Sequence, residues 1–280
     1  MNAPGLPEPV ARRLDSFARD HRRIAPDALT RLLVTGSAIA GDWWPGTSDI
    51  DVVFVVDRPL TETELDTLRI LHAETIPDGP IDGIYLTEEQ LAGPPDDLGA
   101  AIQVVEGKLT PDLPGSQLTW ITWREMETGV ETEVTDTGIH AWSASRRRWR
   151  GSVEGSQGFS RQNLLDYWAP LGSSAREQLK ARQDDVPVAA SSVVWLALGP
   201  PRLLVTITTG EIVSKSAAAT FAANRWPEFS DLLLRAVASR AGDQITFTAG
   251  DARSAVALLE KCVAAAAPPE HRRLADTLDG

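Results

Sequence analysis

The sequence has one cysteine and four histidines among its 280 residues. The single Cys262 excludes an intrachain disulfide and any zinc site built from several cysteines, so we expect a protein of the reducing cytoplasm. No Ser-His-Asp or Cys-His arrangement is suggested. The histidines are scattered without the spacing of a metal site: His21, His72, His140 and His271.

Long hydrophobic runs are lacking as well. No apolar run approaches the 18 residues of a membrane-spanning helix, and the first residues do not form a signal-peptide pattern, so we expect no membrane partner. Hydrophobic residues still make up 42% of the chain and charged residues 24%. This is enough for the cores of one large or two moderate soluble domains.

Positive charge is in the minority, with 27 Lys and Arg against 39 Asp and Glu and a net charge of −12. Broad binding to nucleic acid needs clustered Lys and Arg, so we expect no nucleic-acid partner. An acidic surface attracts cationic small molecules, although the same charge also serves solubility. We interpret the one dense basic run, residues 146–150, mainly as a solvated face, with a phosphate contact as the alternative.

The stretch around which the chain is organised runs from Arg31 to Val56. An apolar run breaks at Gly36-Ser37, and a second strand opens with Asp49 and Asp51. Alternate residues of a strand share a face, so these two carboxylates stand side by side. They repel each other unless a cation lies between them, and Mg²⁺ takes one or two carboxylates together with phosphate oxygens. The plain alternative is a strand end with two solvated acids.

This motif carries a resemblance. Gly-Ser, eleven intervening residues and then Asp-Ile-Asp resemble the signature of the nucleotidyltransferase (DNA polymerase β-like) superfamily. More narrowly, TGSAIAG followed by TSDIDVV is similar to the aminoglycoside adenylyltransferases that modify streptomycin and spectinomycin, enzymes of antibiotic resistance. The resemblance implies ATP as co-substrate and Mg²⁺ held by Asp49 and Asp51. The nucleotide contacts that it implies in the motif are Gly36, Ser37 and Ser48.

A third carboxylate on the neighbouring strand completes such sites in the superfamily, and Asp82 matches it by position. The adenylyltransferases have a glutamate there as catalytic base. The shorter Asp82 leaves two roles open, base or third metal ligand, and a plain turn acid after Asp78-Gly79 is the alternative. The resemblance also implies that Arg202 and Lys215 hold the triphosphate, whereas without it both would be ordinary surface cations.

Hydrophobic periodicity and capping signals predict the following order of elements. The N-terminal part has a helix over 10–20, strands at 31–35, 49–56, 81–86 and 130–134, and helices from Thr61 and over 119–128; the segment 97–110 is a strand or mixed. The C-terminal part has helices at 164–168, 175–182, 193–199, 215–224, 229–241 and 251–266. Propensity makes residues 203–209 a strand, but the resemblance favours a helix that opens at Pro200-Pro201, and we follow it.

The Gly- and Ser-rich residues 151–158 are the best linker candidate and set a domain boundary. The predicted fold class is α+β: a nucleotidyltransferase-type mixed β-sheet with helices in residues 1–155, and an all-α helical bundle in residues 156–280. ATP is expected in the cleft between the two domains.

We therefore predict a cytoplasmic, monomeric adenylyltransferase that transfers AMP from ATP to a hydroxyl of a cationic, aminoglycoside-like molecule and releases pyrophosphate. The alternatives are transfer to another small metabolite or a protein side chain, and a nucleotide-binding relative without turnover. The resemblance fails at the acceptor site, because the region 183–188 offers Asp184 and Asp185 but no Trp. Aromatic residues that could stack on a sugar, or belong to the core, are Trp43, Trp44, Tyr167, Trp168 and Trp195.

Overall fold

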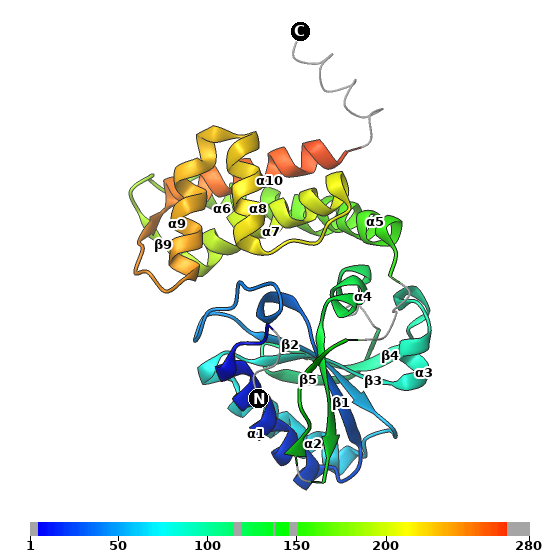
Figure 1. Ribbon diagram of the computed structural model, residues 1–280. Coiled ribbons are helices and arrows are strands. Elements are labelled where there is room, and N and C mark those ends of the chain that lie inside the picture. Colours follow the sequence, from blue (N-terminus) through cyan, green and yellow to red (C-terminus); the bar gives the residue numbers. More distant parts are fainter. Residues whose placement is uncertain (1–4, 115–118, 137, 146–150, 268–280) are drawn as a thin grey trace. The chain divides into compact units, whose positions relative to one another are not determined.

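The computed structural model describes residues 5–114, 119–136, 138–145 and 151–267. The chain divides into two compact units, Met1–Ser152 and Val153–Gly280 (Figure 1). This division falls close to the predicted boundary at residue 155. The basic run at 146–150 lies outside the described residues.

The N-terminal unit is built on a mixed sheet with the order β5-β4-β3-β2-β1-β6-β7, and β8 also pairs with β6. The pair β2–β3 is parallel, and the other described pairs of this sheet are antiparallel. The strands are β1 (Leu29–Val34), β2 (Ile50–Val56), β3 (Ile81–Thr87), β4 (Ala100–Val105), β5 (Lys108–Pro114), β6 (Val130–Thr135), β7 (Gly138–Ile139) and β8 (Ser143–Ala144).

Helices cover both faces of this sheet (Figure 1). Helices α1 (Glu8–Ile24) and α2 (Glu62–Glu74) pack on one face, and α3 (Glu88–Ala92) and α4 (Trp120–Glu127) pack on the other. Helix α2 begins with the predicted capping box, since Thr61 accepts from the Glu64 N–H and the Glu64 side chain accepts from the Thr61 N–H.

Strand β2 is apolar along its length because both of its faces are covered. Its even-numbered residues Ile50, Val52, Phe54 and Val56 belong to the core beneath α1 and α2, whereas Val53 and Val55 belong to the core beneath α3 and α4. Asp51 has the parity of Val53. It therefore lies on the second face, at the end of the strand where the apolar residues stop.

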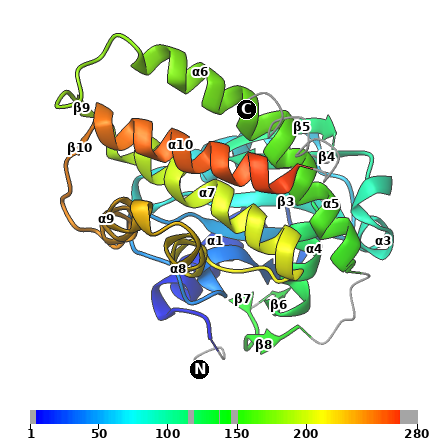
Figure 2. The same cartoon turned by 90° about the horizontal axis from the view of Figure 1, so that it is seen from above.

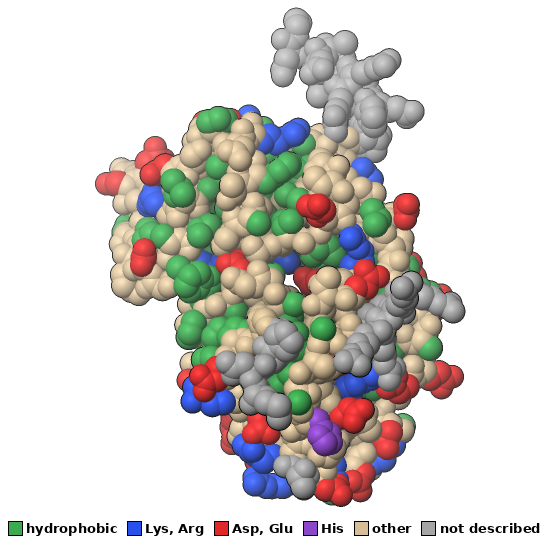
Figure 3. Space-filling view, viewed as in Figure 1, with side chains coloured by type: hydrophobic (Ala, Val, Ile, Leu, Met, Phe, Trp, Pro, Cys, Tyr) green, Lys and Arg blue, Asp and Glu red, His purple; other side chains and the backbone are tan. Residues whose placement is uncertain are grey.

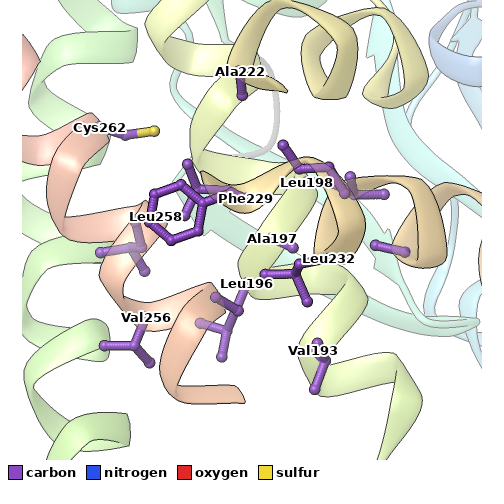
Figure 4. Close-up of a cluster of buried hydrophobic side chains, with 14 of the residues drawn as sticks. Val193, Leu196, Ala197, Leu198, Ala222, Phe229, Leu232, Val256, Leu258 and Cys262 are labelled. Atoms are coloured by element: carbon purple, nitrogen blue, oxygen red, sulfur yellow. The ribbon is translucent and has the colours of Figure 1, made fainter. Parts of the chain in front are cut away.

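The C-terminal unit is helical. Helices α7 and α10 lie side by side at its centre, and α7 also contacts α5, α8 and α9 (Figure 2). Leu196, Phe229, Leu258 and Cys262 are among the side chains that meet in its core (Figure 4). The helices are α5 (Val153–Asn163), α6 (Ala169–Leu179), α7 (Ala190–Thr209), α8 (Lys215–Arg225), α9 (Ser230–Arg240) and α10 (Ala249–Ala266). A small ladder of β9 (Pro187–Val188) and β10 (Phe247–Thr248), which the sequence did not predict, joins two loops.

Two expectations are wrong. The linker predicted at 151–158 is mostly helix, because α5 begins at Val153 and its small residues Ser156 and Ser160 are buried, while α5 packs on α7. The helix predicted to end at Gly199 instead continues through Pro200 and Pro201 as the single helix α7. Each proline removes one backbone hydrogen bond of the helix. The free energy gained by burying α7 residues on both sides of the prolines outweighs this loss. The helical assignment of 203–209 is confirmed.

Among the described residues, one helix is long and apolar enough to cross a membrane by length and composition, and it is α7. Half of its apolar window is buried inside the protein. The helix supplies core residues on both sides of its prolines, from Val193 to Ile207. We therefore assign α7 to the core of the C-terminal unit.

Candidate active site

Gly36 and Asp51 meet at the end of strand β1. The Thr35 N–H donates to the Asp51 carbonyl at 3.0 Å, which continues the β1–β2 ladder to this point. Gly36 has a φ of +66°, and an ideal Cβ built on it would overlap Oδ2 of Asp51. A glycine is required here for both reasons. The Gly-Ser and Asp-x-Asp parts of the motif are thus in direct contact.

The loop between these strands folds back on itself. The Ser48 hydroxyl is buried and accepts from the Trp44 N–H at 3.1 Å, so Ser48 shapes the loop immediately before Asp49. The Ser37 hydroxyl is also buried, but it has no hydrogen-bond partner among the described residues. A buried hydroxyl without a partner, on the residue that follows Gly36, is the kind of group that a bound ligand satisfies.

Of the two loop tryptophans, Trp43 packs against the core beneath α1 and α2, so it caps the core edge. Trp44 donates through Nε1 to Asp42 at 3.3 Å. Asp42 is 5% exposed, and sequence reasoning missed this buried loop acid.

Asp82 stands beside Asp51, because the two residues are register partners in the parallel pair β2–β3. Neighbouring strands lie about 4.8 Å apart, so the two side chains project from the same face at close range. The Asp82 carboxylate accepts from the Glu106 N–H at 2.7 Å and from the Gly107 N–H at 2.8 Å, at the tip of the β4–β5 hairpin. Burial raises the pKa of Asp82, these two bonds oppose the rise, and the charges of Asp49 and Glu106 add to it.

The three carboxylates Asp49, Asp51 and Asp82 remain a predicted set of metal ligands. Within the described ranges, no group of three or more His, Cys, Asp and Glu side chains is placed to hold a metal ion. Each oxygen of Asp82 already accepts one N–H donor, which leaves each oxygen a second lone pair for a proton or a cation. The carboxylates of Asp49 and Asp51 are the kind of ligand that a hard cation takes together with phosphate oxygens. The Ser37 hydroxyl, which has no partner among the described residues, and the glycine at position 36 suit the approach of a phosphate.

In the C-terminal unit, Arg202 and Lys215 are brought together although they lie on different helices. Arg202, on α7, donates through Nε to the Val213 carbonyl at 3.1 Å, just before the start of α8. Ser214 caps α8 as predicted, and Lys215 occupies the first turn. The positive end of a helix dipole and two cations therefore lie close to one another.

The acceptor candidates differ in exposure. Trp168 is buried, whereas Tyr167 is 50% and Trp195 is 41% exposed. The Trp195 ring contacts the other two, with centroid distances of 4.5 Å to Trp168 and 6.2 Å to Tyr167. Asp184 pairs with Arg253 and braces α10, so it is engaged within the unit.

Sequence reasoning missed the hairpin tip and Arg13. The sequence contains a pattern that predicts the hairpin, since a two-residue turn that ends in glycine, Glu106-Gly107, separates β4 from β5. No such pattern points to Arg13. Its guanidinium donates to backbone carbonyls in the connection between α2 and β3, some 60 residues further along the chain.

Residues 171–265 match the family model of the aminoglycoside adenylyltransferase C-terminal domain. The chain is also similar to the crystal structure of spectinomycin adenyltransferase AAD(9) from Enterococcus faecialis with ATP and spectinomycin, with a TM-score of 0.54 and 16% identity over 90% of this chain and 98% of that chain. No curated protein sequence matches. The fold class and the resemblance to the aminoglycoside adenylyltransferases are confirmed.

Proposed function

We propose that this protein, whose C-terminal unit carries the aminoglycoside adenylyltransferase domain, transfers AMP from ATP to a hydroxyl of an aminoglycoside-like acceptor and releases pyrophosphate. The observation that carries the proposal is the pairing of Asp51 with Asp82 across β2–β3, with Gly36 packed against the Asp51 carboxylate. In this proposal Asp51 holds a cation and Asp82, on the adjacent strand, accepts a proton.

Asp49 and Asp51 would hold Mg²⁺, which when bound supplies charge neutralisation for the triphosphate. Gly36 allows the backbone to approach a phosphate closely, and the Ser37 hydroxyl offers a hydrogen bond that it does not make within the described structure. Ser48 holds the loop beneath these groups.

Asp82 accepts the proton of the attacking hydroxyl in this proposal. The two hairpin N–H groups fix its orientation and favour its charged form, while its raised pKa makes it a stronger base than an exposed aspartate. Arg202 and Lys215 neutralise the charge that develops on the leaving pyrophosphate.

We propose a cationic acceptor, because the proposed site adds Asp49, Asp51 and Asp82 to a chain of net charge −12. Tyr167 and Trp195 present exposed rings on which a sugar or an aglycone can stack. Figure 3 shows basic side chains interspersed with acidic ones on the face drawn, in keeping with no nucleic-acid partner. We also propose that the protein is a monomer of the cytoplasm without a membrane partner. Its one cysteine, Cys262, is a buried free thiol, which is compatible with a reducing compartment.

Pyrophosphate release, measured with ATP and Mg²⁺ against spectinomycin, streptomycin and other aminoglycosides, tests this function. We expect release that depends on one or more of these acceptors. Release that requires another small metabolite or a protein hydroxyl would keep the chemistry and change the substrate. Binding of ATP without any release would indicate a nucleotide-binding relative.

The variant Asp51→Asn gives the matched control. We expect turnover to fall by about 10²–10³-fold, because a cation ligand and its charge are lost at the reacting phosphate. The thermal midpoint should stay equal or rise, since one of two repelling carboxylates is removed. Unchanged turnover would contradict the two-carboxylate site.

A further inference from the structure

We infer that Arg13 is a positioning residue for the carboxylate centre of the proposed transfer reaction. It lies on α1 and touches none of the three aspartates in the hydrogen bonds described above. Its guanidinium donates to the Asp78 carbonyl at 2.8 Å, to the Thr75 carbonyl at 3.3 Å and to the Gly79 carbonyl. One side chain thus holds the whole connection between α2 and β3. The inference rests on the proposed function and deepens it.

This connection supports the first carboxylate pair. Gly79 has a φ of +90°, and an ideal Cβ on it would lie 2.6 Å from the Ser48 carbonyl oxygen. The backbone before Asp49 therefore rests directly on Gly79. The Ile50 N–H donates to the Pro80 carbonyl at 2.9 Å, which joins the start of β2 to the same connection.

The connection also supports Asp82. The Ile81 N–H donates to the Thr75 hydroxyl at 3.0 Å, so the residue before Asp82 is tied to the turn. Ile76 lies against Gly107, where an ideal Cβ would overlap its side chain. Gly107 belongs to the hairpin tip that donates to the Asp82 carboxylate. A shift of residues 75–79 therefore reaches both sides of the centre.

An arginine suits this place for two reasons. The carbonyls that it binds follow the C-terminal end of α2, where the helix dipole is negative and cations are stabilising. Its planar fork can serve several carbonyls at once, which a lysine ammonium does less well. Burial of the guanidinium lowers the pKa of Arg13, and the charge of the nearby Asp78 opposes this change. The guanidinium is therefore partly desolvated where it makes these hydrogen bonds. Misplacement of reacting groups by about 1 Å can lower a rate 10²-fold.

The test uses the full-length protein with Arg13→Met, Arg13→Lys and two controls. Arg12→Met removes an exposed neighbour that pairs only with Glu8 in the described contacts. Leu14→Ala opens the core beneath α1 and destabilises the unit while leaving the Arg13 contacts in place. Mn²⁺ affinity is measured by electron paramagnetic resonance, and turnover by pyrophosphate release with spectinomycin.

We expect Arg13→Met to lower Mn²⁺ affinity and kcat by about tenfold or more, as loss of a supporting contact around a metal site does. Arg13→Lys should recover part of both losses. Leu14→Ala should lower the thermal midpoint and keep both quantities. Equal behaviour of Arg13→Met and Leu14→Ala, or an unchanged Arg13→Met, would overturn the inference.

A second readout separates this inference from the proposed function. Amide hydrogen exchange at Ile50, Glu106 and Gly107 should accelerate in Arg13→Met and not in Arg12→Met, whether or not the protein turns over ATP. If wild-type protein binds no Mn²⁺ and releases no pyrophosphate, the proposed function fails. Unaltered exchange at these three amides overturns the role of Arg13 by itself.

Discussion

At the scale of single residues, Asp82 combines a structural and a proposed chemical role. Its carboxylate fixes the tip of the β4–β5 hairpin through two N–H donors. The same bonds hold it at a fixed place beside Asp51, where we propose that it takes the proton of the acceptor hydroxyl. The two roles are tested by substitutions at Asp82 itself and at Glu106, whose charge raises the pKa of Asp82.

Asp82→Asn should lower kcat by about 10²–10⁴-fold and change ATP affinity little, because proton acceptance acts in the transition state. The free energy of unfolding should also fall by about 1–3 kcal/mol, since the Asn amide cannot accept from both N–H donors. Steady-state kinetics and denaturant unfolding measure the two effects. A variant with normal kcat and a loosened hairpin would leave Asp82 a purely structural residue.

Glu106→Gln keeps the backbone N–H that binds Asp82 and removes a charge that raises its pKa. The pKa of Asp82 should therefore fall. A base acts when deprotonated, so kcat declines as pH falls through this pKa, and the decline in Glu106→Gln should lie at lower pH than in the wild type. A pH profile of kcat gives the comparison, and an acid limb that does not move would remove Asp82 as its source.

At the scale of elements, a π-helical turn in the C-terminal unit places a tryptophan ring against a glycine of α7. Helices α5 and α6 are joined without a break by a π-helical turn, Leu164–Trp168, in which the Ala169 N–H returns to the Leu164 carbonyl. Such a turn accommodates Pro170 near the start of α6, because proline has no N–H to donate. The Trp168 side chain from this turn then packs on α7 at Gly199.

Two glycines inside helices should respond to alanine with opposite signs. Gly158 on α5 is exposed and has open space around an added Cβ, so Gly158→Ala should stabilise the protein by about 0.5–1 kcal/mol. A Cβ on Gly199 would lie 2.6 Å from the rigid Trp168 ring, so Gly199→Ala should destabilise by about 1–3 kcal/mol. Urea unfolding measures both. Equal signs would mean that the α7–Trp168 contact is looser than described.

The start of α8 is the element through which the C-terminal unit is proposed to bind ATP. Lys215→Ala should weaken ATP binding by about tenfold or more, because a charge-assisted contact to phosphate contributes about 1.5–3 kcal/mol. Lys180→Ala is the control, since Lys180 is an exposed lysine that pairs with Glu177 on α6. Calorimetry with Mg²⁺ present compares them. Equal affinities of the two variants would place Lys215 on the plain surface.

At the scale of the whole molecule, a buried aromatic cluster makes the free energy of unfolding depend on pH. Phe17, His21, Phe54, His72 and Tyr85 pack their rings together beneath α1 and α2. His72 binds the Tyr85 hydroxyl at 2.9 Å and the Ile81 carbonyl at 3.1 Å, but neither ring nitrogen of His21 has a partner among the described residues. Burial lowers the pKa of His21 to about 3 and that of His72 to about 4.

Both histidines bind protons more readily unfolded than folded, so the stability that they contribute is present above pH 6.5 and is lost as pH falls toward 3–4. At pH 5 the loss should be about 2 kcal/mol for each histidine. His21→Phe should remove about half of this acid sensitivity. Unfolding free energies at pH 7.5 and 5 test this, and an unchanged slope in His21→Phe would locate the acid sensitivity elsewhere.

Much of this protein follows from its sequence alone. The alternation around Asp51, the Thr61 capping box and the Ser214 cap depend on neighbours within a few positions, so the printed order of residues determines them. The placement of Asp82 opposite Asp51 followed from the resemblance and a strand pattern. Local periodicity also predicted the first helix, and the helices after residue 210, close to their observed bounds.

Tertiary structure decided the rest, because the deciding contacts join residues far apart in the chain. Helix α5 replaces the expected linker, since it packs on α7 and buries two of its serines. Helix α7 passes through Pro200 and Pro201, since both of its halves belong to one core. The occupation of both Asp82 oxygens by the hairpin tip, and the hold of Arg13 on residues 75–79, depend on which backbone groups the fold brings within 3.5 Å, and no local pattern contains that information.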